Sequence, residues 1–156
     1  MDESVLRAMR KWPHVPTVYG WLALDRRGNW RIRDEKIGNA ALRDFIGRNY
    51  QADARGRWFF QNGPQRVFVR LEYTPLVLRL DGAAVRDHCG RAFAPTATFL
   101  DDRGAVLMSG GGSVGLLDDR DLQAFAGAMG EAVAKLPKIP SSAVPARFAF
   151  DPDPKP

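Results

Sequence analysis

Residues 58–80 read WFFQNGPQRVFVRLEYTPLVLRL, and this stretch decides how the rest of the chain is interpreted. Asn62-Gly63 stands between two apolar runs of β-favouring residues, which is the strongest short-range signal for a hairpin. Side chains alternate along a strand, so Val67 and Phe68 are expected on opposite faces. We predict that this hairpin forms the centre of a sheet and that its aromatic side chains belong to the core.

The composition indicates a folded chain of modest size. Its 156 residues are 45% hydrophobic and include nine Phe and four Trp, enough for a real core. We expect one compact domain over residues 1–137, with possible halves at 17–80 and 94–137. Five prolines fall in residues 138–156, and this tail is expected to be extended and partly mobile.

The sequence shows no pattern that predicts a targeting signal. No run of about 18 apolar residues predicts a membrane span, and the first residues lack the apolar stretch of a signal peptide. Cys89 is the single cysteine, which fits a reducing compartment. These features predict a cytoplasmic protein without a membrane partner.

The charge is basic and uneven. The net charge is +5, and residues 1–80 carry 15 Lys and Arg against 8 Asp and Glu. The arginines are scattered singly, as expected for a solvated face, whereas nucleic-acid footprints usually form clustered stripes. Nucleic-acid binding stays open as an alternative because bases and aromatics interleave around the hairpin, and sheet aromatics can stack on RNA bases. The residues for that alternative are Arg57, Trp58, Arg66 and Arg70.

The other elements follow from turn and helix signals. Asp-x-x-Gly turns at 25–28, 53–56 and 101–104 separate predicted strands. A short helix is expected from Ser4 to Trp12, and Asn39 is the expected N-cap of a helix ending near residue 49. Asp118 or Asp119 is expected to cap a helix reaching Leu136. The fold class is therefore α+β: an antiparallel, hairpin-built twisted sheet with helices packed on it. The remaining expected strands are 17–24, 29–33, 96–100, 105–108 and 114–116, while 83–90 is a helical turn or a loop.

Two segments of the sequence resemble each other. Residues 24–28 (LDRRG) precede the helical stretch 42–47, and residues 100–104 (LDDRG) precede the stretch 122–127. Both describe a strand, a turn, a strand and then a helix, which would make the protein two copies of one hairpin–helix motif. Coincidence is the alternative, because each signal is common. Superposing 17–50 on 94–130 would decide between them.

A resemblance extends over about a third of the chain. The pattern is similar to small bacterial domain-of-unknown-function proteins built from repeated α/β motifs, in which a Gly-x-Trp hairpin leads through a helix to an Asp-Gly hairpin and an acidic-x-Pro-Phe element. Leu76 stands here in place of that Phe, and Tyr73-Thr74 lies near the acidic position. The resemblance implies repeated motifs and a suggested signalling or ligand-binding role, and it brings no catalytic residues. The matching positions are Gly28-Asn29-Trp30, Ile37, Leu42, Phe45, Asp53, Gly56, Trp58, Val69 and Pro75-Leu76.

Groups that could perform chemistry are sparse. An imidazole beside a thiolate could activate a nucleophile at His88-Cys89, but sequence neighbours rarely face each other. The segment Ser109, Gly110, Gly111, Gly112 could cradle a phosphate through its N–H groups, although it lacks the ending of a P-loop and is expected to be a flexible loop. Asp118, Asp119 and Asp121 are interpreted as helix-start charges. We predict no catalytic residue, no metal site and no cofactor.

The predicted function is that of a non-enzymatic regulatory module. Its partner would be a small molecule or a protein, bound with His88, Cys89 and Ser109–Gly112 as candidate ligand-binding residues. A nucleic-acid-binding protein and an enzyme of unknown type remain the alternatives. Homo-oligomerisation is left undetermined, because exposed edge strands permit it without favouring it.

Overall fold

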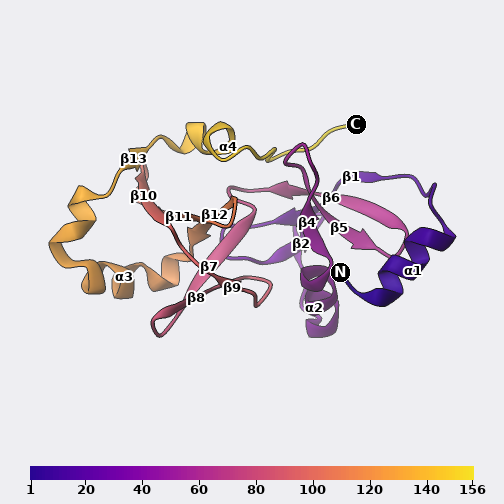
Figure 1. Ribbon diagram of the computed structural model, residues 1–156, viewed down its shortest axis with the longest axis horizontal. Helices are drawn as coiled ribbons and strands as arrows, with labels where there is room; N and C mark the ends of the chain where they lie inside the picture. Colours follow the sequence, from indigo (N-terminus) through magenta and orange to yellow (C-terminus); the bar gives the residue numbers. More distant parts are fainter. The chain divides into compact units, whose positions relative to one another are not determined.

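A computed structural model describes residues 1–156, and the chain divides into two compact units. Each unit contains one mixed sheet and at least one helix (Figure 1), so the predicted α+β class is confirmed. The proposed limits of a single domain are not tested by this division and stay a prediction. Unit 1 comprises residues 1–25, 29–72 and 149–156, and unit 2 comprises residues 26–28 and 73–148.

The sheet of unit 1 has six strands in the spatial order β3-β2-β1-β6-β5-β4. β1–β3 form one antiparallel meander and β4–β6 another. The first strand of one meander lies parallel to the last strand of the other, with Leu22 opposite Val69. The strands are β1 Val18–Leu24, β2 Trp30–Ile32, β3 Glu35–Lys36, β4 Tyr50–Ala52, β5 Trp58–Asn62 and β6 Gln65–Leu71.

The hairpin predicted from the sequence is β5–β6. Asn62 pairs with Gln65, so Gly63 and Pro64 form the two-residue turn. Gly63 has a φ of 57°, which suits the first position of a type II′ turn. The aromatic side chains Phe59, Phe60 and Phe68 are buried, as predicted for core residues.

Helix α2, Ala40–Arg48, confirms the predicted cap. The Leu42 N–H donates to the Asn39 side-chain oxygen at 2.9 Å, which satisfies one of the N–H groups that a helix start leaves unpaired. Phe45 meets Phe60 of β5 edge to face, with ring centroids 5.5 Å apart. The helix is thereby fixed on the core face of the sheet.

Helix α1, Glu3–Lys11, begins earlier than predicted, since Asp2 and not Ser4 occupies its N-cap position. The backbone N–H of Asp2 donates to the buried Asn49 side chain at 2.7 Å. The Asp2 carboxylate forms an ion pair with Arg48 at 3.2 Å. Both partners of Asp2 are more than 40 residues away in the sequence, so local capping preferences favoured Ser4 instead.

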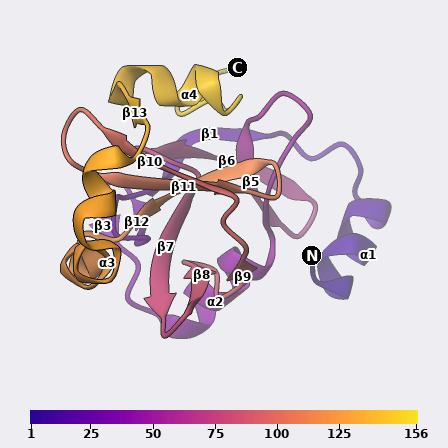
Figure 2. The same cartoon turned by 60° about the vertical axis from the view of Figure 1, so that its left-hand side comes forward.

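The sheet of unit 2 has seven strands in the order β13-β10-β11-β12-β7-β8-β9. β7–β9 form one antiparallel meander and β10–β12 another; Figure 2 shows β7 and β8 side by side. β7 lies parallel to β12, with Val77 opposite Leu116. The strands are β7 Leu76–Asp81, β8 Ala84–Asp87, β9 Ala92–Phe93, β10 Ala97–Asp101, β11 Val106–Gly110, β12 Ser113–Leu117 and β13 Lys138–Ile139.

The two sheets share a connection scheme, because in each the first strand of one meander pairs in parallel with the last strand of the next. On this scheme, residues 50–71 are equivalent to residues 98–119 in the order of the strands. The alignment suggested by the sequence is different: it equates β1, at the centre of its sheet, with β10, which lies second from an edge. The internal repeat therefore stays a prediction, with the strand order favouring another register.

Three local predictions for unit 2 are wrong. Residues 84–87 form strand β8 and not a helical turn or a loop. The expected flexible loop at 109–113 is the end of β11 followed by a tight turn, with Gly111 and Gly112 between the paired Gly110 and Ser113. The expected continuous α-helix to Leu136 is interrupted: after a 3₁₀ turn at Asp119–Asp121, α3 covers Leu122–Met129. From Gly130, whose φ is 58°, the chain continues as a 3₁₀ helix to Lys135.

The proline-rich segment is also more structured than predicted. It contains β13, a 3₁₀ turn at Ser141–Ala143 and helix α4, Val144–Arg147. Ile139, Val144 and Phe150 are buried, so these parts of the segment pack against the core. No helix of the chain has both the length and the apolar character needed to cross a membrane.

Candidate functional site

The Asp-x-x-Gly turn at 101–104 presents an arginine from the sheet of unit 2. The buried Asp101 carboxylate accepts hydrogen bonds from the N–H groups of Arg103, at 2.9 Å, and Ala105, at 2.8 Å. Gly104, with a φ of 78°, allows the chain to return into β11. Because the backbone is held in this way, the Arg103 side chain extends outward from an ordered turn.

The same Asp101 carboxylate also accepts a hydrogen bond from a buried tyrosine, which holds the turn in place. The Tyr73 hydroxyl donates to Asp101 Oδ2 at 2.7 Å, and both residues are buried. Burial and the Asp101 carboxylate raise the pKa of Tyr73 well above its usual value, so the phenol stays protonated and keeps donating. The Arg26 guanidinium lies over the Tyr73 ring, 4.7 Å from its centroid, which brings a further cation to the same region.

Arg26 and Arg103 border a cavity of about 290 Å³ within unit 2. Three arginines and one aspartate are its polar lining residues, and the remaining residues are apolar. Such a combination of a few polar groups over an apolar floor is typical of small-molecule sites. The lining consists of Arg26, Arg27, Arg103, Gly104, Ala105, Leu116, Leu117, Asp119 and Leu122. We refer to this cavity as the arginine pocket.

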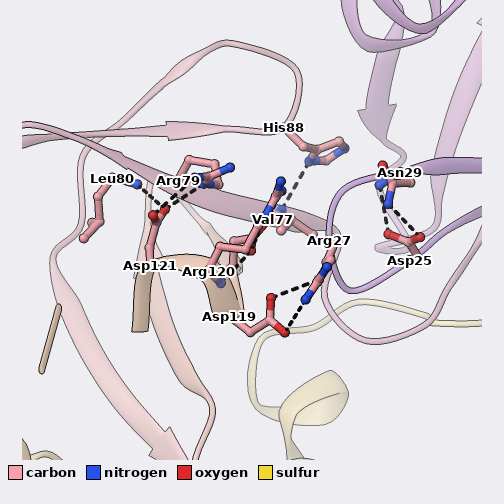
Figure 3. A network of polar contacts seen from close by, with 11 residues as sticks. Asp25, Arg27, Asn29, Val77, Arg79, Leu80, His88, Asp119, Arg120 and Asp121 are labelled. Carbon is pink, nitrogen blue, oxygen red and sulfur yellow. Dashed lines mark hydrogen bonds and ion pairs between the residues drawn. The ribbon is translucent and has the colours of Figure 1, made fainter. Parts of the chain in front are cut away.

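The cations of the arginine pocket differ in how firmly they are held. Arg27 forms two 3.0 Å hydrogen bonds with the Asp119 carboxylate (Figure 3). Both side chains are more than half exposed, so solvent screens the pair and another anion could replace Asp119. The Arg103 side chain has no hydrogen bond or ion pair within the chain. Arg103 therefore provides the pocket with a guanidinium that no carboxylate of the chain neutralises.

The acidic run before α3 is neutralised by arginines. Asp118 accepts hydrogen bonds from the Arg120 N–H and side chain, so it caps the 3₁₀ turn that leads into α3, whose own N-cap position is Asp121. Burial acts to raise the pKa of Asp118, but the Arg120 hydrogen bonds outweigh it and hold that pKa below its usual value. Asp121 binds Arg79 at 2.7 Å, on the other side of the turn in Figure 3. No group of His, Cys, Asp or Glu side chains has the arrangement of a metal site.

The glycine segment Ser109–Gly112 does not border the arginine pocket. The Ser109 carbonyl accepts from the Thr96 N–H at 2.8 Å, so it is occupied by the strand ladder. A Cβ added to Gly110 would stand 2.2 Å from the Ala94 carbonyl oxygen, which explains the absence of a side chain there. Close strand packing accounts for this segment, and its proposed ligand-binding role is not tested.

His88 and Cys89 lie in another turn of unit 2, closed by the Asp87 carboxylate. Asp87 accepts from the N–H groups of Cys89, at 2.9 Å, and Arg91, at 3.0 Å. His88 Nδ1 accepts from the Val77 N–H at 3.2 Å, which ties the imidazole to the neighbouring strand β7 (Figure 3). Neither residue lines the arginine pocket.

We expect Cys89 to react slowly with thiol reagents while the protein is folded. Burial, and to a lesser degree the Asp87 carboxylate, raise the pKa of the thiol to about 12. An unperturbed thiol has a pKa of about 8.5, so near pH 8 the folded protein contains at least about a hundredfold less thiolate. Labelling with a disulfide reagent should therefore be at least about a hundredfold slower than in concentrated urea. Equal rates in the two conditions would contradict the buried, protonated thiol.

The residues proposed for nucleic-acid binding divide between the two faces of the β5–β6 hairpin. Trp58 lies on the opposite face of β5–β6 from Arg66 and Arg70, because the strand pairing aligns Phe59 with Phe68. Arg57 is committed to Asp53 at 2.7 Å, and Arg66 lies over the buried Phe59 ring, 3.8 Å from its centroid. No single exposed row of aromatics and arginines results.

The arginine pocket was missed at the sequence level. Arg26, Arg27 and Arg103 lie inside two of the Asp-x-x-Gly turns that were recognised, so the turns themselves were the available signal. Nothing in the local pattern showed that both turns would border one cavity.

Two solved structures that are similar to this chain belong to the DUF1285 family. A DUF1285 family protein from Silicibacter pomeroyi DSS-3 is 15% identical, with a TM-score of 0.55 over 76% of this chain and 74% of that one. A DUF1285 family protein from Shewanella baltica OS155 is 16% identical, with a TM-score of 0.51 over 68% of this chain and 90% of that one. At these identities the likeness concerns the fold alone.

The family comparison covers almost the whole chain. No curated protein matches its sequence. The DUF2944 family model, described as "Protein of unknown function (DUF2946)", matches residues 1–155. The chain therefore belongs to the DUF2944 family.

Proposed function

We propose that the protein is a binding module for a small anionic ligand held in the arginine pocket. The observation that carries this proposal is the set of three arginines, Arg26, Arg27 and Arg103, that line one cavity together with apolar residues. A guanidinium matches carboxylate and phosphate groups with two parallel hydrogen bonds. The floor of Ala105, Leu116, Leu117 and Leu122 favours a ligand that also carries an apolar portion.

The concave shape favours a small molecule over a protein partner. A cavity of about 290 Å³ is near the lower end of the range for ligand sites, and a folded partner would need a far larger contact surface. No group within the pocket is positioned as an acid, base or nucleophile in this proposal. Binding without chemistry is what the lining supports.

A regulatory role can follow from the Arg27–Asp119 pair. A ligand anion that takes Arg27 competes with Asp119, which belongs to the 3₁₀ turn leading directly into α3. Ligand binding would thereby release the start of α3 from one of its ion pairs. This coupling is our proposal for the signalling role implied by the sequence resemblance.

The shared connection scheme of the two sheets supports duplication of one motif as part of the proposal. Asp53 and Asp101 start equivalent turns in the two sheets. Ten residues after each of them a glycine, Gly63 or Gly111, begins a two-residue turn. Arg55 then corresponds to Arg103, but Arg55 does not line the arginine pocket. In this proposal the two copies have diverged, and the arginine pocket belongs to the second.

A thermal-shift screen with organic acids and organic phosphates, benzoate and phenyl phosphate among them, tests the proposal. A ligand present at about a hundredfold its Kd stabilises the folded state by about 2.7 kcal/mol, which is several degrees in Tm for a chain of this size. Arg103→Ser should remove most of the shift. Arg55→Ser is the matched control, because Arg55 is an exposed arginine at the same position of an equivalent turn.

Two results would overturn the proposed function. One is a screen in which no carboxylate or phosphate raises Tm in the unmodified protein. The other is an equal shift in the Arg103→Ser and Arg55→Ser variants, which would place the anion elsewhere.

A further inference from the structure

Unit 1 contains a separate hollow of about 360 Å³ that the proposed function does not use. Strand β1 forms one side of it, the β2–β3 turn another, and the C-terminal residues a third. Its lining consists of Gly20, Trp21, Leu22, Ala23, Arg33, Asp34, Arg70, Asp153 and Lys155. We refer to this hollow as the Trp21 hollow.

Trp21 is unusual among the large apolar residues of the sheet. Its side chain is 45% exposed, whereas Leu22 and Leu24 of the same strand are buried. The pairing of β1 with β6 is irregular between Val18 and Leu22, and Gly20 within this bulge has a φ of 70°. Bulges re-aim side chains and are frequent beside functional sites. The bulge thus leaves an indole ring bordering the hollow where a flat ligand can stack on it.

Three cations surround the same hollow. Arg33 has an exposed side chain without an ion pair in the chain. Arg70 meets Asp34 only at 3.5 Å, and both of these side chains are more than half exposed. Lys155 pairs with Asp153 at 2.9 Å. Three positive groups against two carboxylates leave an excess of positive charge beside the tryptophan.

The backbone of the β2–β3 turn is strained where it contributes to the hollow. Arg33 has a φ of 49° and Asp34 a φ of 68°, in the left-handed region. This conformation costs a residue with a Cβ about 1–2 kcal/mol, and arginine has no local hydrogen-bonding habit that offsets it. Strained residues of this kind cluster at ligand sites. Glycine would serve the turn better, so an arginine here indicates a use for its side chain.

We propose that the Trp21 hollow binds a nucleoside monophosphate. The base stacks on the Trp21 indole, and the phosphate is held by Arg33 and Arg70 with Lys155 beside them. Stacking on an aromatic side chain tolerates different bases, since every base has a π-face. A ligand with a flat ring and an anionic group satisfies both halves of the lining at once, whereas an aliphatic anion leaves the indole unused.

Isothermal titration of the full chain with AMP tests this site, alongside adenosine, which lacks the phosphate, and ribose 5-phosphate, which lacks the base. AMP should bind at least about tenfold more tightly than either fragment. Trp21→Ala should weaken AMP binding about tenfold or more, as expected for a lost stacking contact of about 1–3 kcal/mol. Trp12→Ala is the matched control, because Trp12 is also exposed, at 55%, and lies near a cation, Lys11.

Arg33→Gly separates binding from folding. Glycine relieves the positive φ of residue 33 while removing the guanidinium, so Tm should stay the same or rise. AMP and ribose 5-phosphate binding should both weaken several-fold. A loss of affinity in a variant that is at least as stable cannot be attributed to unfolding.

Three outcomes would overturn the Trp21 site: no AMP binding at millimolar concentration, equal AMP affinity in the Trp21→Ala and Trp12→Ala variants, or equal affinity for AMP and ribose 5-phosphate. AMP binding that is lost in Arg103→Ser but kept in Trp21→Ala would place the nucleotide in the arginine pocket. That result would reject this second site and leave the proposed function standing.

Discussion

Replacing Gly56 by alanine is expected to destabilise unit 1 by about 2–5 kcal/mol. A Cβ at this position would stand 2.1 Å from the Ala149 carbonyl oxygen and 3.0 Å from Phe150 Cα. Both are backbone atoms, so no side chain can rotate away. Gly56 also has a φ of 76°, which costs an alanine about 1–2 kcal/mol, and the overpacking adds about 1–3 kcal/mol. Urea unfolding followed by tryptophan fluorescence measures the free energy of unfolding.

Gly20→Ala is the control for the backbone conformation alone. Gly20 lies in the same unit with a φ of 70°, but an added Cβ meets no atom within 4 Å. It should cost only the conformational part, about 1–2 kcal/mol. Equal losses for the two variants would show that the contact between Gly56 and residues 149–150 is absent in solution.

Replacing Asp101 by alanine should destabilise unit 2 by about 3 kcal/mol. This carboxylate, 5% exposed, accepts hydrogen bonds from the Tyr73 hydroxyl and from the N–H groups of Arg103 and Ala105. Its removal leaves three donors in or near the interior without their acceptor, and each such loss costs about 1–3 kcal/mol when water cannot enter. Chemical unfolding provides the measurement.

Two further variants locate the source of that loss. Tyr73→Phe should cost about 1 kcal/mol, and combining it with Asp101→Ala should be less than additive because both changes remove the same hydrogen bond. Asp81→Ala removes an exposed carboxylate paired with Arg86 and should change stability by less than about 0.5 kcal/mol. Additive losses at Tyr73 and Asp101 would contradict the direct contact.

The parts of the fold that were predictable from the sequence are those determined by near neighbours. The β5–β6 hairpin depends on Gly63 and on alternating apolar side chains, and the Asn39 cap depends on an N–H three residues away. Both signals are contained in a few consecutive residues, so both predictions are confirmed. The Asp118 cap follows the same rule.

The parts that were not predictable depend on residues far apart in sequence. Ala84–Asp87 is a strand because β7 pairs with it, although its own residues alternate poorly. The glycines at 110–112 looked like a flexible loop, yet Gly110 is required by the approach of Ala94 and the two that follow form a tight turn. Propensity alone could not distinguish these cases.

The candidate site was less accessible to sequence reasoning than the fold. Each arginine of the pocket could be placed on a turn, but the pocket also needs Leu116 and Leu117 of β12 and Leu122 at the start of α3. The strand order that brings these elements near one another includes a parallel pairing between β7 and β12, which no local pattern encodes. The sequence showed which residues carry charge, but it did not show that they would line one cavity.

The bridge between Arg57 and Asp151 has a consequence for synthesis on the ribosome. Residues 149–156 belong to unit 1, where the Asp151 N–H donates to the Gly56 carbonyl and the Pro152 carbonyl accepts from Leu71. All of residues 73–148 must be translated before these partners exist. Most of unit 1 therefore leaves the ribosome first, but the unit is completed last. Until residues 149–156 are translated, the Gly56 carbonyl and the Leu71 N–H are hydrogen-bonded to water instead of to their partners.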